Sequence, residues 1–187
     1  YSHSFMPRGR LMEHVKTDTA PYDMWEQQGL VTVTGGEGDY KNDYKFIARH
    51  LKELRDEYGL SFEAVGYDNH NADGFLSDLE ELGCPLLEVR QSAKNLNDAT
   101  MDVKLLVKGA KYRYDRSNEL MSWSFANAKL VYNSFGECKV DKNYGPTKRI
   151  DPVDACIDAH YARMKLADEA DVDAEQAMTD YLAEMGW

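Results

Sequence analysis

The stretch that decides the fold is Thr147-Lys148-Arg149-Ile150-Asp151-Pro152-Val153-Asp154-Ala155-Cys156-Ile157-Asp158-Ala159-His160. A proline directly after Asp151 is typical of the first position of a helix, where its missing N–H costs nothing. Asp151 is then expected to be the N-cap, accepting hydrogen bonds from free backbone N–H groups. Asp154 and Asp158 follow at spacings of three and four, so the three carboxylates are predicted to share one helix face. Because like charges on one face repel, the pattern indicates either a solvated acidic face or a site for a divalent metal ion.

The composition is that of one folded domain. With 187 residues, of which 43% are hydrophobic and 11% aromatic, the chain is long enough to bury a core. No apolar run reaches membrane-spanning length and no signal segment opens the chain, so no membrane association is expected. The three cysteines lack zinc-site spacing, which favours reduced thiols. A net charge of −11 argues against non-specific DNA binding by the whole surface, but it leaves room for a local basic groove.

The elements expected before the acidic helix alternate between helix and strand. The predicted helices are 43–58, one that ends at Gly83, 95–108 and 118–128; the predicted strands are 1–8, 30–34, 61–68, 85–90, 112–114 and the two arms of a hairpin at 129–132 and 138–141. A polar linker anchored by Trp25 is expected between the first two strands. The acidic helix should run to about residue 170, with a last helix starting at Asp173. This order predicts an α/β fold, with helices covering a sheet.

Asp68 is the last residue of the predicted strand 61–68. Sites in α/β proteins are built at the carboxyl ends of strands. Taken alone, however, Asp68 is better interpreted as an Asx turn that caps the next helix. The glycine-rich segment 35–38 is predicted to be a turn, because no Gly-Lys-Ser/Thr follows it as in a P-loop. This chain is therefore not expected to hydrolyse ATP.

Three segments, taken in order, resemble the C-terminal nuclease domain of the large terminase subunit of tailed bacteriophages. They are Pro21-Tyr22…Trp25…Gly29-Leu30 leading to Asp39-Tyr40, then Val65-Gly66-Tyr67-Asp68 with Asn71-Ala72, and then Asn133-Ser134-Phe135-Gly136-Glu137-Cys138-Lys139-Val140-Asp141-Lys142 followed by Lys148-Arg149-Ile150-Asp151-Pro152-Val153-Asp154-Ala155. The last segment is the most specific, and the resemblance extends to about Met164.

The resemblance implies an RNase H-like (RuvC-type) fold, in which a mixed central sheet is flanked by helices. The nuclease domain is expected over residues 1–166, with an acidic helical tail over 167–187. Since the chain opens with Tyr1 rather than Met, we expect a fragment that lacks the first strand or strands and the family's upstream ATPase domain.

The resemblance also implies a site for two divalent ions, Mg²⁺ or Mn²⁺, held roughly 4 Å apart by acids from different elements. Such hard cations prefer carboxylate oxygens to Cys or His. Asp68 matches the family's second acid and Asp151 its third, with Asp154 as an assisting ligand. The family's first Asp finds no match and is expected to lie outside the chain. Asp158 is expected to be a supporting or surface residue rather than a ligand.

Two cations precede the acidic helix. Lys148 and Arg149 could contact DNA phosphates beside the cut, which would position the DNA without reading its sequence. They could equally be charges that flank a helix and aid solubility.

The implied function is endonucleolytic cutting of concatemeric double-stranded viral DNA in the host cytoplasm, with the portal protein and the small terminase subunit as partners. One alternative is a catalytically silent module that docks on portal, small terminase or DNA, because the first acid is missing. Another is a different RNase H-like nuclease of the resolvase or transposase type.

Overall fold

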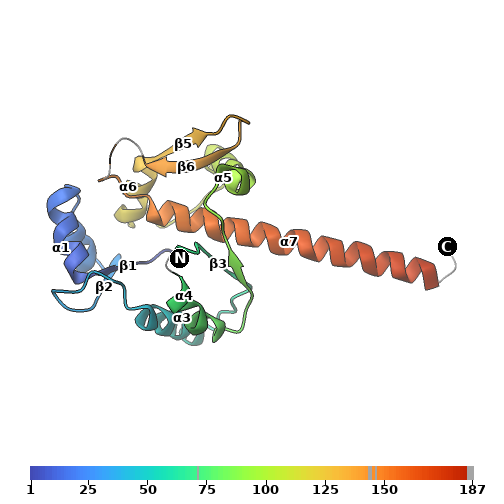
Figure 1. Ribbon diagram of the computed structural model, residues 1–187, viewed down its shortest axis with the longest axis horizontal. Coiled ribbons are helices and arrows are strands. Elements are labelled where there is room, and N and C mark those ends of the chain that lie inside the picture. Colours follow the sequence, from blue (N-terminus) through green and yellow to red (C-terminus); the bar gives the residue numbers. More distant parts are fainter. Residues whose placement is uncertain (71, 143–144, 146, 185–187) are drawn as a thin grey trace.

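A computed structural model describes residues 1–70, 72–142, 145 and 147–184 (Figure 1). The strands are β1 (Ser4–Pro7), β2 (Val31–Thr34), β3 (Val65–Tyr67), β4 (Leu86–Glu88), β5 (Ala128–Tyr132) and β6 (Cys138–Lys142). The helices are α1 (Arg8–Thr17), α2 (Tyr22–Gln27), α3 (Tyr44–Tyr58), α4 (Asp73–Glu80), α5 (Ala93–Lys108), α6 (Glu119–Asn127) and α7 (Asp151–Glu184).

The strands form three small sheets. β1 pairs with β2 and β3 pairs with β4, both in parallel, whereas β5 and β6 form an antiparallel hairpin. In Figure 1, α7 runs through the middle of the body, with the hairpin, α5 and α6 on one side and β3, α3 and α4 on the other. The predicted mixed α/β architecture is confirmed. Within the described residues, however, the strands are distributed over three pairs instead of one continuous central sheet.

Two apolar clusters make up the core. One joins α1, α2, β2 and α6 through buried side chains that include Leu11, Trp25 and Leu120. The other joins α5 to the start of α7 and includes Val103, Val153 and Ile157. Full burial of one such side chain contributes about 1.5–3 kcal/mol, so the apolar residues between the acids of α7 fix this helix against α5.

Local signals in the sequence set the bounds of α3 as predicted. The Asp43 carboxylate accepts a hydrogen bond from the Phe46 N–H at 3.0 Å and caps the first turn. Gly59 ends the helix with a φ of 61°, a left-handed conformation that costs glycine little.

The hairpin was also predicted correctly, with Leu130 opposite Val140. Its turn is held by the side chain of Asn133, whose Oδ1 accepts from the N–H groups of Phe135 and Glu137 at 2.9 and 3.0 Å. The turn therefore fixes the register of β5 against β6. Strand β6 in turn lies next to α5.

Helix α7 differs from the prediction at its start. Asp151 was expected to be the N-cap, but the first intrahelical bonds, from the N–H groups of Val153 and Asp154, go to the carbonyl of Ile150. The Ser124 hydroxyl of α6 accepts from the Val153 N–H at 3.3 Å. Because a neighbouring helix supplies a capping oxygen, Asp151 belongs to the first turn and is not the cap.

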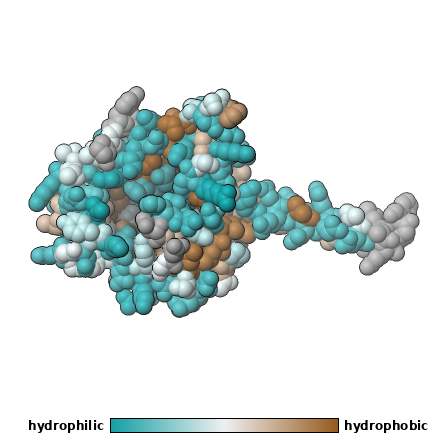
Figure 2. Space-filling model, viewed as in Figure 1, coloured by the Kyte–Doolittle hydropathy of each residue, from teal (hydrophilic) through white to brown (hydrophobic). Residues whose placement is uncertain are grey.

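The predicted break near Asp173 is wrong as well. The helix continues without interruption from Asp151 to Glu184 and leaves the body as a protruding rod (Figures 1 and 2). No Gly or Pro occurs between residues 153 and 184, so nothing in the sequence forces the helix to end. Every side chain described between 167 and 180 is exposed. No helix of the described residues is long and apolar enough to cross a membrane.

Two further predictions fail. The segment expected to be a polar linker folds into α1 and α2, although Trp25 is buried as expected, with 2% of its surface exposed. Residues 112–114 form no strand. Instead, Tyr112 and Tyr114 pack their rings on Phe125 of α6.

Candidate metal centre

Asp68 directly follows β3, at the carboxyl end of a parallel strand pair. Its side chain is exposed, and its Oδ1 accepts a hydrogen bond from the His70 N–H at 3.1 Å. The Asx turn expected at this position is therefore present, but it does not cap the next helix, because α4 starts after Ala72 with no side-chain cap. It uses one carboxylate oxygen and leaves the residue accessible at the edge of the sheet.

The crossing of α7 over β3 brings the acidic helix to Asp68. At the crossing, Gly66 faces the backbone of α7. A Cβ atom there would lie 2.7 Å from the carbonyl oxygen of Asp158 and 3.3 Å from the Cβ of Ala162. Only a residue without a side chain permits this approach, so the sequence Gly66-Tyr67-Asp68 places the strand-end acid beside the helix.

Asp158 lies at this crossing and is almost completely buried, with 9% of its surface exposed. Gln91, three residues beyond β4, donates from Nε2 to both carboxylate oxygens, at 3.0 and 3.2 Å. Burial is the main cause that raises the pKa of Asp158 to about 6; the negative charge of Asp68 raises it further and the Gln91 bonds lower it. Asp158 was expected to be a supporting or surface residue. Its burial excludes the surface position, and a supporting role stays a prediction.

Asp154 lies one turn before Asp158 and is half-buried. Burial, followed by the negative charges of Asp151 and Asp158, raises its pKa to about 7. Lys139 and Lys142 of β6 oppose this rise without cancelling it. The hairpin lysines are thus the cations that face this part of the helix.

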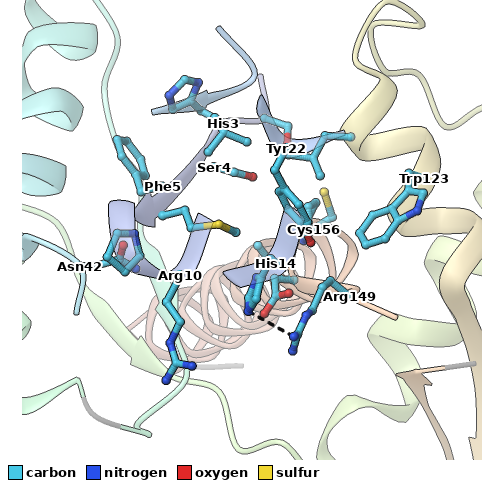
Figure 3. Close-up of a pocket in the computed structure, with 18 of the residues that line it drawn as sticks. His3, Ser4, Phe5, Arg10, His14, Tyr22, Asn42, Trp123, Arg149 and Cys156 are labelled. Carbon is cyan, nitrogen blue, oxygen red and sulfur yellow. Dashed lines mark hydrogen bonds between the residues drawn. The ribbon is translucent and has the colours of Figure 1, made fainter. Parts of the chain in front are cut away.

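Asp151 is exposed and lies toward a different part of the structure. It lines a cavity of about 1090 Å³ between β1 and the start of α7, together with Arg149, Tyr22 and Cys156 (Figure 3). Its charge acts on Asp154 on one side and on Tyr22 on the other. The four acids therefore form a row, which we call the acid row: Asp151, Asp154 and Asp158 along α7, then Asp68 at the end of β3.

The donor set of the acid row fits a hard divalent cation, because all its side-chain donors are carboxylate oxygens. Burial is the largest cause of the raised pKa values of Asp154 and Asp158, and the negative charges of neighbouring acids add to it. Among the described residues, no three His, Cys, Asp or Glu side chains are gathered closely enough to hold a metal ion. The structure thus brings the acids into one row without closing them into a ligand cage.

The two cations before α7 have different surroundings. The guanidinium of Arg149 binds the carboxylate of Asp18, with Nε 2.9 Å from Oδ2, and also contacts His14 Nε2 at 3.2 Å (Figure 3). The Asp18 side chain is 0% exposed, and that of Arg149 is 27% exposed. Arg149 thus pairs a buried acid, a structural role that the sequence did not predict. Lys148 is half-buried, and its contact with DNA stays a prediction.

Two residues of this region were missed from the sequence. Gln91 holds Asp158, and Lys139 donates to the backbone carbonyl of Gln91 at 3.1 Å. A signal for Gln91 did exist. Gln91 lies shortly after β4, and Asp68 lies directly after β3. The carboxyl ends of these adjacent parallel strands meet at the same edge of the sheet.

The structure is thus an α/β domain in which a row of acids on α7 leads to the acid at the carboxyl end of β3. Residues 1–166 match the family model described as terminase large subunit, endonuclease domain, and the chain belongs to that family.

Comparison with known proteins also finds similarity to large terminase subunits. The chain is 30% identical over 147 residues to the large terminase subunit of Enterobacteria phage HK97, an alignment that covers 78% of this chain and 28% of that protein. It also matches the crystal structure of the HK97 bacteriophage large terminase, with a TM-score of 0.71 and 29% identity over 84% of this chain and 32% of that one. The large terminase nuclease from thermophilic phage G20c matches with a TM-score of 0.48 and 16% identity, over 65% of this chain and 63% of that chain.

The RNase H-like fold implied by the sequence is confirmed by the family match and by the similarity to the HK97 structure. This chain spans about 28% of the length of the curated HK97 relative.

Proposed function

We propose that this domain is a metal-dependent endonuclease that cuts concatemeric double-stranded viral DNA in the cytoplasm of the host. The observation that carries the proposal is the acid row itself, in which Asp151, Asp154 and Asp158 follow one another along α7 and the Gly66 contact brings this helix to the strand that ends in Asp68. Membership of the terminase nuclease family supports the same reaction class.

Asp68, Asp151 and Asp154 are the proposed metal ligands. The structure favours Asp158 as a fourth member, because its buried carboxylate senses the charge of Asp68. When bound, two Mg²⁺ or Mn²⁺ ions supply an activated water and stabilise the leaving oxygen of a phosphodiester. The protein's part is to hold the acids in place on α7 and β3, which are fixed by the tight Gly66 crossing.

Local cations offset the acidic surface where the DNA would approach. The net charge of −11 disfavours the approach of a polyanion to most of the protein. Lys139 and Lys142 of the hairpin face the acid row, and Lys148 precedes α7. These lysines are the proposed contacts to the phosphates that flank the cut, a positioning role without base recognition. Arg149 was proposed with Lys148, but its pairing with Asp18 makes it the weaker candidate.

Double-stranded DNA, the portal protein and the small terminase subunit are the proposed partners, since those belong to the packaging machinery of the family. The ATPase activity of packaging is proposed to lie outside this chain.

Plasmid cleavage tests the proposal. The purified chain is incubated with supercoiled plasmid and Mn²⁺. We expect relaxed and linear products that EDTA abolishes, and at least a hundredfold loss of rate in D68N and D154N. The surface variant E63Q serves as control, because Glu63 is exposed on the loop before β3. Full activity in both D68N and D154N would rule out the acid row as the active site.

A second function is favoured by one observation, the absence of a closed three-acid cage among the described residues. The domain would then be a catalytically silent module that docks on DNA or on packaging partners. In that case it would bind DNA in a gel-shift assay without cleaving it in Mn²⁺, and D68N would leave the binding unchanged.

A further inference from the structure

Gln91 makes the contacts that fix the Asp158 carboxylate. Its Nε2 donates to Oδ1 at 3.0 Å and Oδ2 at 3.2 Å, and also lies 3.2 Å from the backbone carbonyl of Val89. Val89 itself is fully buried, so the amide is attached to a rigid part of the core. The carboxylate therefore has little freedom to rotate away from the crossing of α7 with β3.

A third element holds Gln91 in turn. The Lys139 ammonium of β6 donates to the Gln91 backbone carbonyl at 3.1 Å. The strand-end segment after β4 is thus tied to the hairpin on one side and to α7 on the other. One N–H of the Lys139 ammonium donates to the backbone of Gln91. The positive charge of the same group also acts on Asp154.

The chemistry of this support differs from that around the other buried acid of the domain. Asp18 is bound by the Arg149 guanidinium; burial raises its pKa, but the hydrogen bonds from Arg149 and Thr17 outweigh burial and leave it lowered. Asp158 receives hydrogen bonds from a neutral amide, which offsets part of the cost of burial without cancelling the charge. One buried carboxylate is bound by a cation, and the other is held by a neutral donor.

We propose that Gln91 is a positioning residue, which fixes the Asp158 carboxylate at the crossing of α7 with β3 through a neutral donor, so that no ion pair competes there with a divalent cation. The inference rests on the proposed function, because it assumes that the acid row binds metal. It assigns Gln91 no contact with DNA or with the reacting atoms. A cationic side chain at this position would form an ion pair with Asp158, as Arg149 does with Asp18, and would compete with the metal ion.

The test uses the whole 187-residue chain and Mn²⁺ alone as the probe. Mn²⁺ affinity is measured by isothermal titration calorimetry and by the loss of the free-ion electron paramagnetic resonance signal, and the melting temperature is measured without metal. In Q91R we expect a melting temperature at or above that of the wild type, together with at least tenfold weaker Mn²⁺ binding. A merely structural role would move both quantities in the same direction. Gln28, exposed at the end of α2, provides the matched control Q28R.

A second variant keeps the test decisive if Q91R does not fold. Q91M preserves the length of the side chain and removes the donor, so it should weaken Mn²⁺ binding about tenfold in the wild-type background and not at all in D158N. An equal effect of Q91M in both backgrounds would overturn the inference, as would Mn²⁺ affinities of Q91R and Q91M within twofold of the wild type. If the wild-type chain itself shows no saturable Mn²⁺ binding, the proposed function fails along with the inference.

Discussion

The carbonyl oxygen of Asp158 lies 2.7 Å from the point that a Cβ atom on Gly66 would occupy. The neighbour is backbone from the middle of a long helix, which cannot swing aside as a flexible side chain would. Two side-chain atoms also lie close to the same point, Val89 Cγ2 at 3.2 Å and Ala162 Cβ at 3.3 Å. The strand and the helix that share the acid row are thus in backbone contact, and the contact depends on one glycine.

Gly66→Ala should therefore destabilise the domain by about 1–3 kcal/mol, the range expected when an extra methyl group is forced into a packed interior. The free energy of unfolding is measured by urea denaturation. Gly74→Ala is the matched control, since nothing lies within 4 Å of a Cβ there and the position is inside α4. It should stabilise by a few tenths to 1 kcal/mol. Similar values for the two variants would contradict the close approach.

Asp154 should make the metal-free domain less stable as the pH rises. Its pKa is raised to about 7 in the folded state, above the ordinary value of 3.8, so the folded state binds the proton more tightly than the unfolded state does. The penalty is absent below about pH 4 and complete above about pH 7. D154N should thus be more stable than the wild type by roughly 1–2 kcal/mol at pH 8, discounted for solvent screening, and nearly equal to it at pH 4.

The measurement is a series of urea unfolding curves between pH 4 and pH 8 in EDTA. Replacement of the exposed Glu63 in E63Q should leave the pH profile unchanged. A D154N profile parallel to that of the wild type would show that burial does not penalise the ionised carboxylate.

Loss of the Arg149 side chain should mainly lower the free energy of unfolding of the domain rather than its affinity for DNA. R149A leaves the Asp18 carboxylate, whose side chain is 0% exposed, without its cation. Removal of one partner of a buried pair typically costs about 3–5 kcal/mol, and the residual bond from the Tyr22 hydroxyl should keep the loss near the lower end. K148A should stay within about 0.5 kcal/mol of the wild type and weaken DNA binding instead.

Chemical denaturation and a gel-shift assay together check this assignment. The double variant D18N/R149M should recover part of the stability lost in R149M, because the buried negative charge is removed. If R149A is as stable as the wild type and binds DNA poorly, Arg149 is a DNA contact and not a structural cation.

Removal of the tail should hardly affect the fold. Every described side chain from 167 to 180 is exposed, so truncation after Leu166 should change the free energy of unfolding by less than about 0.5 kcal/mol. Truncation after Ala159 would also remove the hydrogen bond between His160 and Asp102 and the bond from Tyr161 to Asn95, and should destabilise the domain clearly. Thermal melting of both forms tests the predicted boundary at residue 166.

Local signals were sufficient to predict elements with caps or turns of their own. Helix α3 has an Asp cap and a terminal glycine, and the hairpin has the Asn133 turn. Helix α1 lacks such signals: no side chain caps its start at Pro7, and only Leu11 is a fully buried apolar residue, so the sequence resembled a linker.

The site was predictable only in outline. Asp68 and the acids of α7 follow from strand-end logic and helical spacing, but their relative order depends on where α7 crosses β3. That crossing is a tertiary contact, which made Asp158 a buried neighbour of Asp68 and left Asp151 exposed toward the cavity. The assignment of the metal ligands therefore stays a prediction.

The unbroken helix α7 has a mechanical consequence. The contact with Gly66 lies near Asp158. At 1.5 Å per residue, about 39 Å of helix separate Asp158 from Glu184, whereas about 6 Å separate it from Asp154. A tilt of about 5° would sweep the far end through roughly 3 Å and shift Asp154 by only about 0.5 Å. A large displacement of the protruding end of α7 thus corresponds to a small displacement of the carboxylates near the contact.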